Sequence, residues 1–257
     1  LRHVGLREGL PEQVLRELDE SVRVTADNTG MTLCLALNYG SRAEITAAGR
    51  GIARQVADGS LAVEDIDERT ISDHLTTPLT METVASRPWD YVVLQGSSYR
   101  VAYEGLLWDV VPDYRAMETA IHEANPDAVV VMFMIYPPQD GDAPGGPGTP
   151  HYTFDELMDG FHEGYVALAD SLGYRLAPVG YAWQLAMTER GDIGLFASDR
   201  SHPSYAGAWL QASVCFATIY LQDPAALVLP GAPDGAVWIQ GHAGQVVLTD
   251  PARWQLP

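Results

Sequence analysis

The sequence contains no lysine. All 15 of its basic residues are arginine, and they stand against 34 acidic residues, which gives a formal net charge of −19. Nucleic acids and anionic lipid surfaces bind to basic patches, so this composition argues against both as partners, and mildly against a polyanionic substrate. An excess of acidic charge also keeps a chain soluble, and a codon-biased acidic surface is sufficient to explain it.

The chain is poor in cysteine and has no long apolar run. Cys34 and Cys215 each have apolar neighbours, so we expect two buried thiols rather than a disulfide or a nucleophile, and no Cys/His cluster has zinc spacing. No run of about 18 apolar residues occurs, so no transmembrane helix is expected. Residues 1–20 lack the apolar core of a signal peptide. Two locations stay open: the protein is cytoplasmic, or it is secreted after removal of an upstream signal.

Helical and strand-like patterns alternate along the chain, and 47% of its 257 residues are hydrophobic. The predicted helices cover 11–26, 42–58, 64–76, 111–124, 153–172, 181–189 and 204–221, and the predicted strands cover 31–38, 90–95, 128–135 and 174–178. This alternation predicts an α/β fold, a three-layer sandwich around one mostly parallel sheet. Residues 137–151, rich in Pro and Gly, predict a long loop, and short alternating runs predict a hairpin or tail over 231–257.

The most informative motif is Asp199-Arg-Ser-His202-Pro203, which precedes a small-residue apolar helix. Pro203 ends any preceding helix and places the motif on a loop. The Asp can orient the imidazole and stabilise its protonated form, so that His202 can take a proton from a nucleophile. A surface turn that holds an Asp and a His is the alternative interpretation.

The motif and three other stretches together resemble the SGNH (GDSL-type) hydrolases over about residues 70–230. The other stretches are residues 89–98, 128–137 and 174–183, which are similar to the strands that precede the site loops of that family. The resemblance implies an SGNH or flavodoxin-like sandwich and an ester substrate. It implies His202 as the base, Asp199 as its orienting acid, and an oxyanion hole formed by Gln95, Gly96 and Ser97.

The nucleophile block of that family is missing, because neither Gly-Asp-Ser nor Gly-Asn-Ser occurs in the chain. Ser41 is the leading candidate nucleophile, since it follows a strand and the tight turn at Gly40 and opens a helix. Helix capping is the alternative role for Ser41. Ser97 and Ser98 are the other candidates.

The N-terminal part resembles a different family. The run Asn38-Tyr-Gly-Ser-Arg-Ala-Glu-Ile45 and the stretches 26–37 and 61–69 are similar to the middle of an undecaprenyl diphosphate synthase-type cis-prenyltransferase. That resemblance covers about residues 1–75 and implies a diphosphate substrate and Mg²⁺. The Asp-Gly-Asn block and the later Arg-Thr-x-Gly-Glu segment of that family are absent.

Together these patterns predict a hybrid chain. Residues 1–75 form the prenyltransferase-like segment, 76–230 the hydrolase-like core, and 231–257 the tail. The main prediction is a serine hydrolase that acts on an ester or acetylated carbohydrate with Ser41, Asp199 and His202, without a cofactor or metal. The alternatives are a cis-prenyltransferase-like diphosphate enzyme, and an inactive hybrid that serves as a binding or scaffold protein. The oligomeric state stays open.

Overall fold

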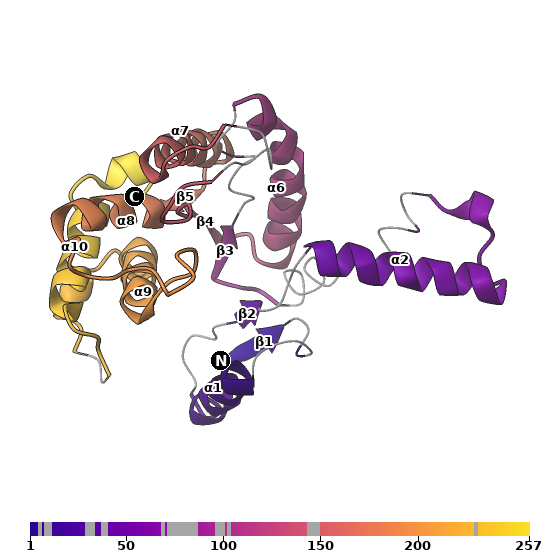
Figure 1. Ribbon diagram of the computed structural model, residues 1–257, viewed down its shortest axis with the longest axis horizontal. Coiled ribbons are helices and arrows are strands. Elements are labelled where there is room, and N and C mark those ends of the chain that lie inside the picture. The colour runs from indigo at the N-terminus through magenta and orange to yellow at the C-terminus, as the bar shows by residue number, and fades with distance from the viewer. Residues whose placement is uncertain are drawn as a thin grey trace. The chain divides into compact units, whose positions relative to one another are not determined.

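The computed structural model describes residues 1–4, 7, 12–28, 34–36, 41–67, 70, 87–95, 101, 104–142, 150–228 and 231–257. The chain divides into two compact units, Leu1–Glu82 and Thr83–Pro257. Figure 1 labels the elements of both.

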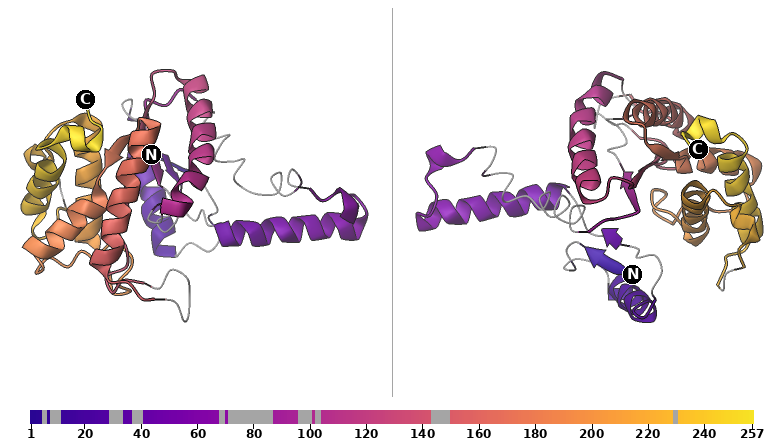
Figure 2. Two further views of the ribbon diagram at one scale, coloured as in Figure 1. Left: turned by 90° about the horizontal axis from the view of Figure 1, so that it is seen from above. Right: turned by 180° about the vertical axis from the view of Figure 1, so that it is seen from behind.

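The first unit is a small α/β arrangement. Its elements are β1 (Arg2–Val4), α1 (Glu12–Val24), β2 (Cys34–Ala36), α2 (Ser41–Asp58) and the short 3-10 helix η1 (Val63–Asp65). Strands β1 and β2 pair in parallel, with His3 opposite Leu35. Leu18 is the buried anchor of α1, while Arg7 and Arg23 form ion pairs with acidic residues on the exposed side of that helix. Helix α2 extends over 18 residues. Figures 1 and 2 show it as one continuous helix.

The second unit is built on a three-stranded parallel sheet in the order β3-β4-β5. Its strands are β3 (Tyr91–Gln95), β4 (Val129–Phe133) and β5 (Arg175–Ala177), and its helices are α6 (Glu104–Ala124), α7 (Phe154–Leu172), α8 (Val179–Glu189), α9 (Tyr205–Tyr220) and α10 (Ala236–Leu248), with the 3-10 helices η2 (Pro224–Ala226) and η3 (Pro251–Trp254). Helices α7 and α9 both pack on β5, and α10 packs on α8 and α9 (Figure 1).

The core of this unit forms because the central strand is apolar on both faces. Val131 and Met132 of β4 and Leu176 of β5 are fully buried, as a parallel sheet covered by helices requires. Local signals set the helix ends. Thr153 and Glu156 form a capping box at the start of α7, and Gly173 ends that helix with φ 71°. The α/β class and the parallel pairing are therefore as predicted.

Two expectations about architecture were wrong. We expected one continuous sheet, but the described strands pair only within their own units, β1 with β2 and β3 with β4 and β5. We also expected a hairpin near the C-terminus, and residues 236–248 instead form α10. Ile239, Ala243 and Val247 recur every four residues and are fully buried, so burial of one helical face overrides the short alternating runs.

Candidate functional site

The predicted acid–base motif lies on a tight loop between α8 and α9. The loop is closed by a bridge between Phe196 and Pro203, and the amide of Ala197 donates to the carbonyl of His202 at 2.8 Å. Ser204 then caps α9, since its hydroxyl accepts a hydrogen bond from the amide of Gly207 at 3.1 Å. Pro203 thus ends the loop, and the prediction of a loop position for Asp199 and His202 is confirmed.

Asp199 holds the loop and the imidazole together. Its Oδ1 accepts from the backbone amides of Ser201 (3.0 Å) and His202 (2.9 Å), and its Oδ2 lies 2.7 Å from His202 Nδ1. The pKa of Asp199 is lowered to about 2 by three hydrogen bonds. The largest effect comes from the backbone amide of His202, followed by the backbone amide of Ser201 and the side chain of His202. Asp199 is therefore a carboxylate at neutral pH.

This carboxylate fixes the tautomer of His202. Because a carboxylate only accepts hydrogen bonds, Nδ1 donates, and in the neutral imidazole Nε2 carries the lone pair. The side chain of His202 is 79% exposed, so Nε2 is open to solvent. The pair can accept a proton from a group that approaches from outside.

The loop is docked against the carboxyl edge of the sheet. The amide of Gln139, beyond the end of β4, donates to the carbonyl of Arg200 at 2.8 Å, and the guanidinium of Arg200 pairs with Asp140. Arg200 has φ 59°, a left-handed conformation that these contacts hold. This loop and the segment after β4 therefore lie at the same edge of the sheet, and Asp140 is the ion-pair partner of Arg200.

An aromatic cluster lies beneath this edge. Tyr136 stacks on Trp183 with ring centroids 3.6 Å apart, and Phe196 meets both rings edge-on. Burial raises the pKa of Tyr136 to about 12, although its hydroxyl accepts from Gln211 at 3.1 Å. No pattern in the sequence predicts this cluster, because its residues come from separate elements and share no motif.

Among the other predicted site residues, Gln95 is the one whose side chain the structure describes. Gln95 is exposed at the carboxyl end of β3, and Gly96, Ser97 and Ser98 lie outside the described residues. Ser41 is the first residue of α2, as its predicted helix-start position requires, but its side chain lies outside the described residues. Within those residues, no hydrogen bond joins a serine hydroxyl to His202.

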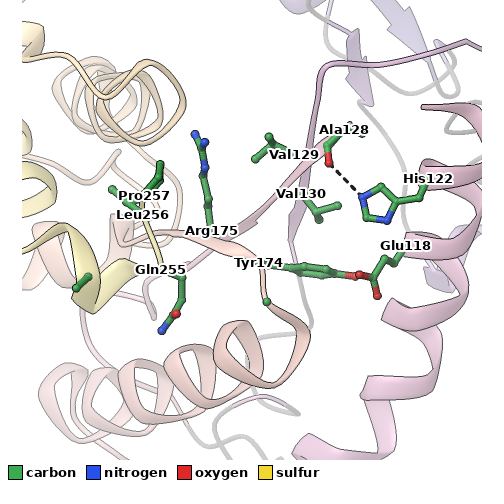
Figure 3. Close-up of a pocket in the computed structure, with 12 residues that line it drawn as sticks. Glu118, His122, Ala128, Val129, Val130, Tyr174, Arg175, Gln255, Leu256 and Pro257 are labelled. Atoms are coloured by element: carbon green, nitrogen blue, oxygen red, sulfur yellow. Dashed lines mark hydrogen bonds between the residues drawn. The ribbon is translucent and has the colours of Figure 1, made fainter. Parts of the chain in front are cut away.

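A cavity of about 540 Å³ opens at the opposite edge of the same sheet (Figure 3). It is lined by Val129 and Val130 at the start of β4, by Tyr174 and Arg175 at the start of β5, and by the C-terminal residues 255–257. Several of its polar groups are already bonded within the protein. His122 Nε2 donates to the carbonyl of Ala128 at 3.1 Å, Tyr174 donates to the carbonyl of Tyr114, and Glu118 pairs with Arg115.

The comparison with protein families points to the N-terminal part of the chain. The model of the family described as "Putative undecaprenyl diphosphate synthase" matches residues 1–120. Residues 1–120 are similar to an isoprenoid-diphosphate enzyme family.

Curated relatives agree with this match. The chain is 50% identical over 78 residues to isoprenyl transferase 2 of Corynebacterium efficiens, which is 30% of this chain and 32% of the relative. It is 46% identical over 77 residues to the isoprenyl transferase of Bacillus subtilis, which is 30% of each chain. It is 33% identical over 110 residues to that of Rhodopirellula baltica, which is 43% of this chain and 42% of the relative. The chain thus spans less than half the length of these relatives.

The fold has a likeness among solved structures. A DUF4886 family protein from Bacteroides uniformis aligns with a TM-score of 0.56 at 15% identity, over 67% of each chain. At this identity the likeness shows a shared fold alone.

These comparisons overturn the main functional prediction. The SGNH ester hydrolase and its carbohydrate ester substrate are contradicted by the isoprenyl transferase similarity, which favours the alternative prediction. The physical reason is local. Asp199 accepts two backbone amides of its own loop, so an Asp three residues before a His has a structural use that is independent of ester hydrolysis. The catalytic roles predicted for Ser41, Asp199 and His202 stay predictions.

Proposed function

We propose that the N-terminal part of this chain is a cis-prenyltransferase-like segment that binds the diphosphate of an isoprenoid substrate. The observation that carries the proposal is the similarity to isoprenyl transferases, which reaches 50% identity over 78 residues. Similarity of this degree over a continuous segment supports conserved local structure, and the run from Asn38 to Ile45 lies in the resembling segment.

The start of α2 is the part of this segment that suits an anion. Helix α2 begins at Ser41 shortly after β2 and has 18 residues. The first turn of a helix carries unpaired backbone amides and a partial positive charge, and Arg42 adds a permanent positive charge to this turn. Together these groups offer the directional hydrogen bonds that a diphosphate needs.

The net charge of −19 argues only weakly against binding of a diphosphate at one site. Screening at physiological salt reduces charge interactions beyond about 8 Å, so most surface carboxylates act weakly at any one site. Glu44 lies two positions after Arg42 in the same helix, so the proposed attraction depends on the first-turn amides together with Arg42 and not on the net charge of the turn.

The resemblance also implies Mg²⁺ beside the diphosphate. Among the described residues, no group of three or more His, Cys, Asp or Glu side chains converges to hold a metal. Mg²⁺ is usually held by one or two carboxylates together with substrate phosphates, so the absence of such a group does not exclude the ion. The proposal therefore concerns recognition of the diphosphate by the chain's own groups.

A calorimetric titration of the full chain with farnesyl diphosphate tests the proposal. We expect binding that farnesol, which lacks the diphosphate, does not reproduce. Arg42→Ala should weaken the affinity about tenfold or more, because it removes a charge-assisted hydrogen bond.

Arg54→Ala is the matched control, since Arg54 is exposed on the same helix, away from its first turn. It removes the same formal charge and should change the affinity by no more than about twofold. An equal loss of affinity in the two variants would show that net charge, and not the position of Arg42, determines binding. An absence of binding by the unmodified chain, or equal affinity for farnesol, would contradict the proposal.

A further inference from the structure

Four side chains form a cluster that ties the C-terminal segment to two helices. His162 of α7 stacks on Tyr181 of α8 with ring centroids 5.2 Å apart. Arg253 of η3 lies over the rings of Tyr181 (4.5 Å) and Trp254 (4.8 Å). Its guanidinium approaches His162 Nε2 at 3.1 Å and donates to the Tyr181 hydroxyl at 3.3 Å. These contacts join residues up to 91 positions apart in the sequence.

The contact between Arg253 and His162 requires one protonation state. A guanidinium stays charged at any accessible pH and only donates hydrogen bonds. His162 Nε2 must therefore accept, so the proton of the neutral ring is on Nδ1. A protonated imidazole has no acceptor left and would place two cations about 3 Å apart.

The segment held by Arg253 also forms one wall of the cavity in the second unit. Ala252, Gln255, Leu256 and Pro257 line that cavity, and Figure 3 shows Gln255, Leu256 and Pro257 beside it. Trp254 is 1% exposed, and its indole donates to the carbonyl of Val246 at 2.9 Å. The wall is therefore held by contacts that do not depend on the protonation of His162, such as the indole hydrogen bond of Trp254, and by the Arg253–His162 contact, which does.

We propose that His162 and Arg253 form a proton-sensitive latch that holds residues 251–257 against α7 and α8 and, when His162 is protonated, loosens this wall of the cavity. Two residues of η3 contact His162: Arg253 through the hydrogen bond to Nε2, and Trp254 through an edge-on ring contact at 6.0 Å. Of these two contacts, protonation of His162 breaks the hydrogen bond. The consequence is a cavity that is more accessible in acid than at neutral pH.

The surrounding charges set the direction. Burial, and then the positive charge of Arg253, lower the pKa of His162, while Glu163 and Asp159 on its own helix act in the opposite sense and are outweighed. Tyr181 faces the ring from α8. The pKa of His162 in the folded protein lies below its ordinary value of 6.5. The stabilisation of the folded state by neutral His162 is therefore complete above pH 6.5, and it is lost as the pH falls through the folded-state pKa.

Hydrogen exchange measured by mass spectrometry tests the latch on the full chain. The reporters are the amides of Arg253, Gln255 and Leu256, which donate at 3.1–3.2 Å to the carbonyls of Asp250, Ala252 and Pro251, respectively. After correction for intrinsic rates, their protection should fall about tenfold between about pH 7.5 and about pH 5.5. In His162→Gln the protection should not change with pH, because the amide oxygen accepts from Arg253 at either pH.

Two further variants sharpen the test. His151→Gln removes an exposed histidine and should keep the pH dependence of the unmodified chain. Arg253→Met keeps an aliphatic side chain without the guanidinium, and should show low protection at both pH values. The same pH dependence in His162→Gln as in the unmodified chain would overturn the proposal, as would constant protection in the unmodified chain.

A measurement without mutation keeps the proposal falsifiable if a variant fails to fold. Nitrogen chemical shifts of the His162 ring report the tautomer directly. We expect an Nδ1-protonated neutral ring at neutral pH and a pKa below 6.5. The Nε2-protonated tautomer, or a pKa of 6.5 or higher, would exclude the latch.

Discussion

The carboxylate of Asp199 holds His202 by two different bonds, one to its backbone amide at 2.9 Å and one to its imidazole Nδ1 at 2.7 Å. The first bond belongs to the turn and the second to the side chain. A single acid therefore shapes the loop and sets the tautomer of the histidine. The two effects are separable by experiment.

The titration of Asp199 should survive the loss of the imidazole. Its pKa of about 2 depends first on the backbone amides of His202 and Ser201, so His202→Ala should leave it below the ordinary value of 3.8. Carboxyl carbon shifts followed by NMR measure this pKa. The linked stabilisation is present above pH 3.8 and is lost as the pH falls through about 2.

Asp192 provides the matched contrast. Its pKa is lowered mainly by the Arg190 guanidinium, which donates to it at 2.7 Å. In Arg190→Ala the pKa of Asp192 should return towards 3.8. A return of Asp199 to 3.8 in His202→Ala would show that the imidazole, and not the turn, holds that carboxylate.

Gly207 in the first turn of α9 should tolerate no side chain. A Cβ at this position would lie 2.2 Å from the carbonyl oxygen of Leu195 and 2.4 Å from the ring of Trp183. Gly207→Ala should lower the free energy of unfolding by about 2–3 kcal/mol, because the backbone or the buried indole must move. Urea denaturation followed by circular dichroism measures the change.

Gly241 in α10 is the control, because a Cβ there meets nothing within 4 Å. Gly241→Ala should raise the free energy of unfolding by about 0.5–1 kcal/mol through helix propensity. If the two variants had equal free energies of unfolding, close packing at Gly207 would not explain the effect of the added methyl group.

Cys215 should be chemically inert in the folded protein. Burial raises the pKa of its thiol to about 12, so little thiolate forms at about pH 8. In a Cys34→Ser background, labelling by a thiol-directed disulfide reagent should be at least about a hundredfold slower than in denaturant. Equal rates in the folded and unfolded protein would show that Cys215 is accessible.

The candidate site was predicted from sequence only where its geometry is local. Asp199 and His202 are three positions apart, so one short loop fixes their contact, and the motif was sufficient to predict that Asp199 can orient the imidazole. The partners of that loop, Gln139 and Asp140, lie about 60 positions away, and no pattern in the sequence links them to Arg200. The ester hydrolysis predicted from the motif was wrong for the same reason. A local turn determines its own hydrogen bonds but not which distant residues lie next to it.

The sequence by itself determined the alternation of strands and helices, the parallel α/β class, and helix ends such as Gly173, because apolar periodicity, glycine conformation and proline sterics act over a few residues. Tertiary structure decided that residues 236–248 form a helix, that the described strands divide into two sheets, and that Arg253 meets His162 across 91 positions. These outcomes depend on which surfaces, distant in the sequence, pack against one another. The free energy gained by burying apolar surface is a sum over the whole packed chain, so no single segment determines it.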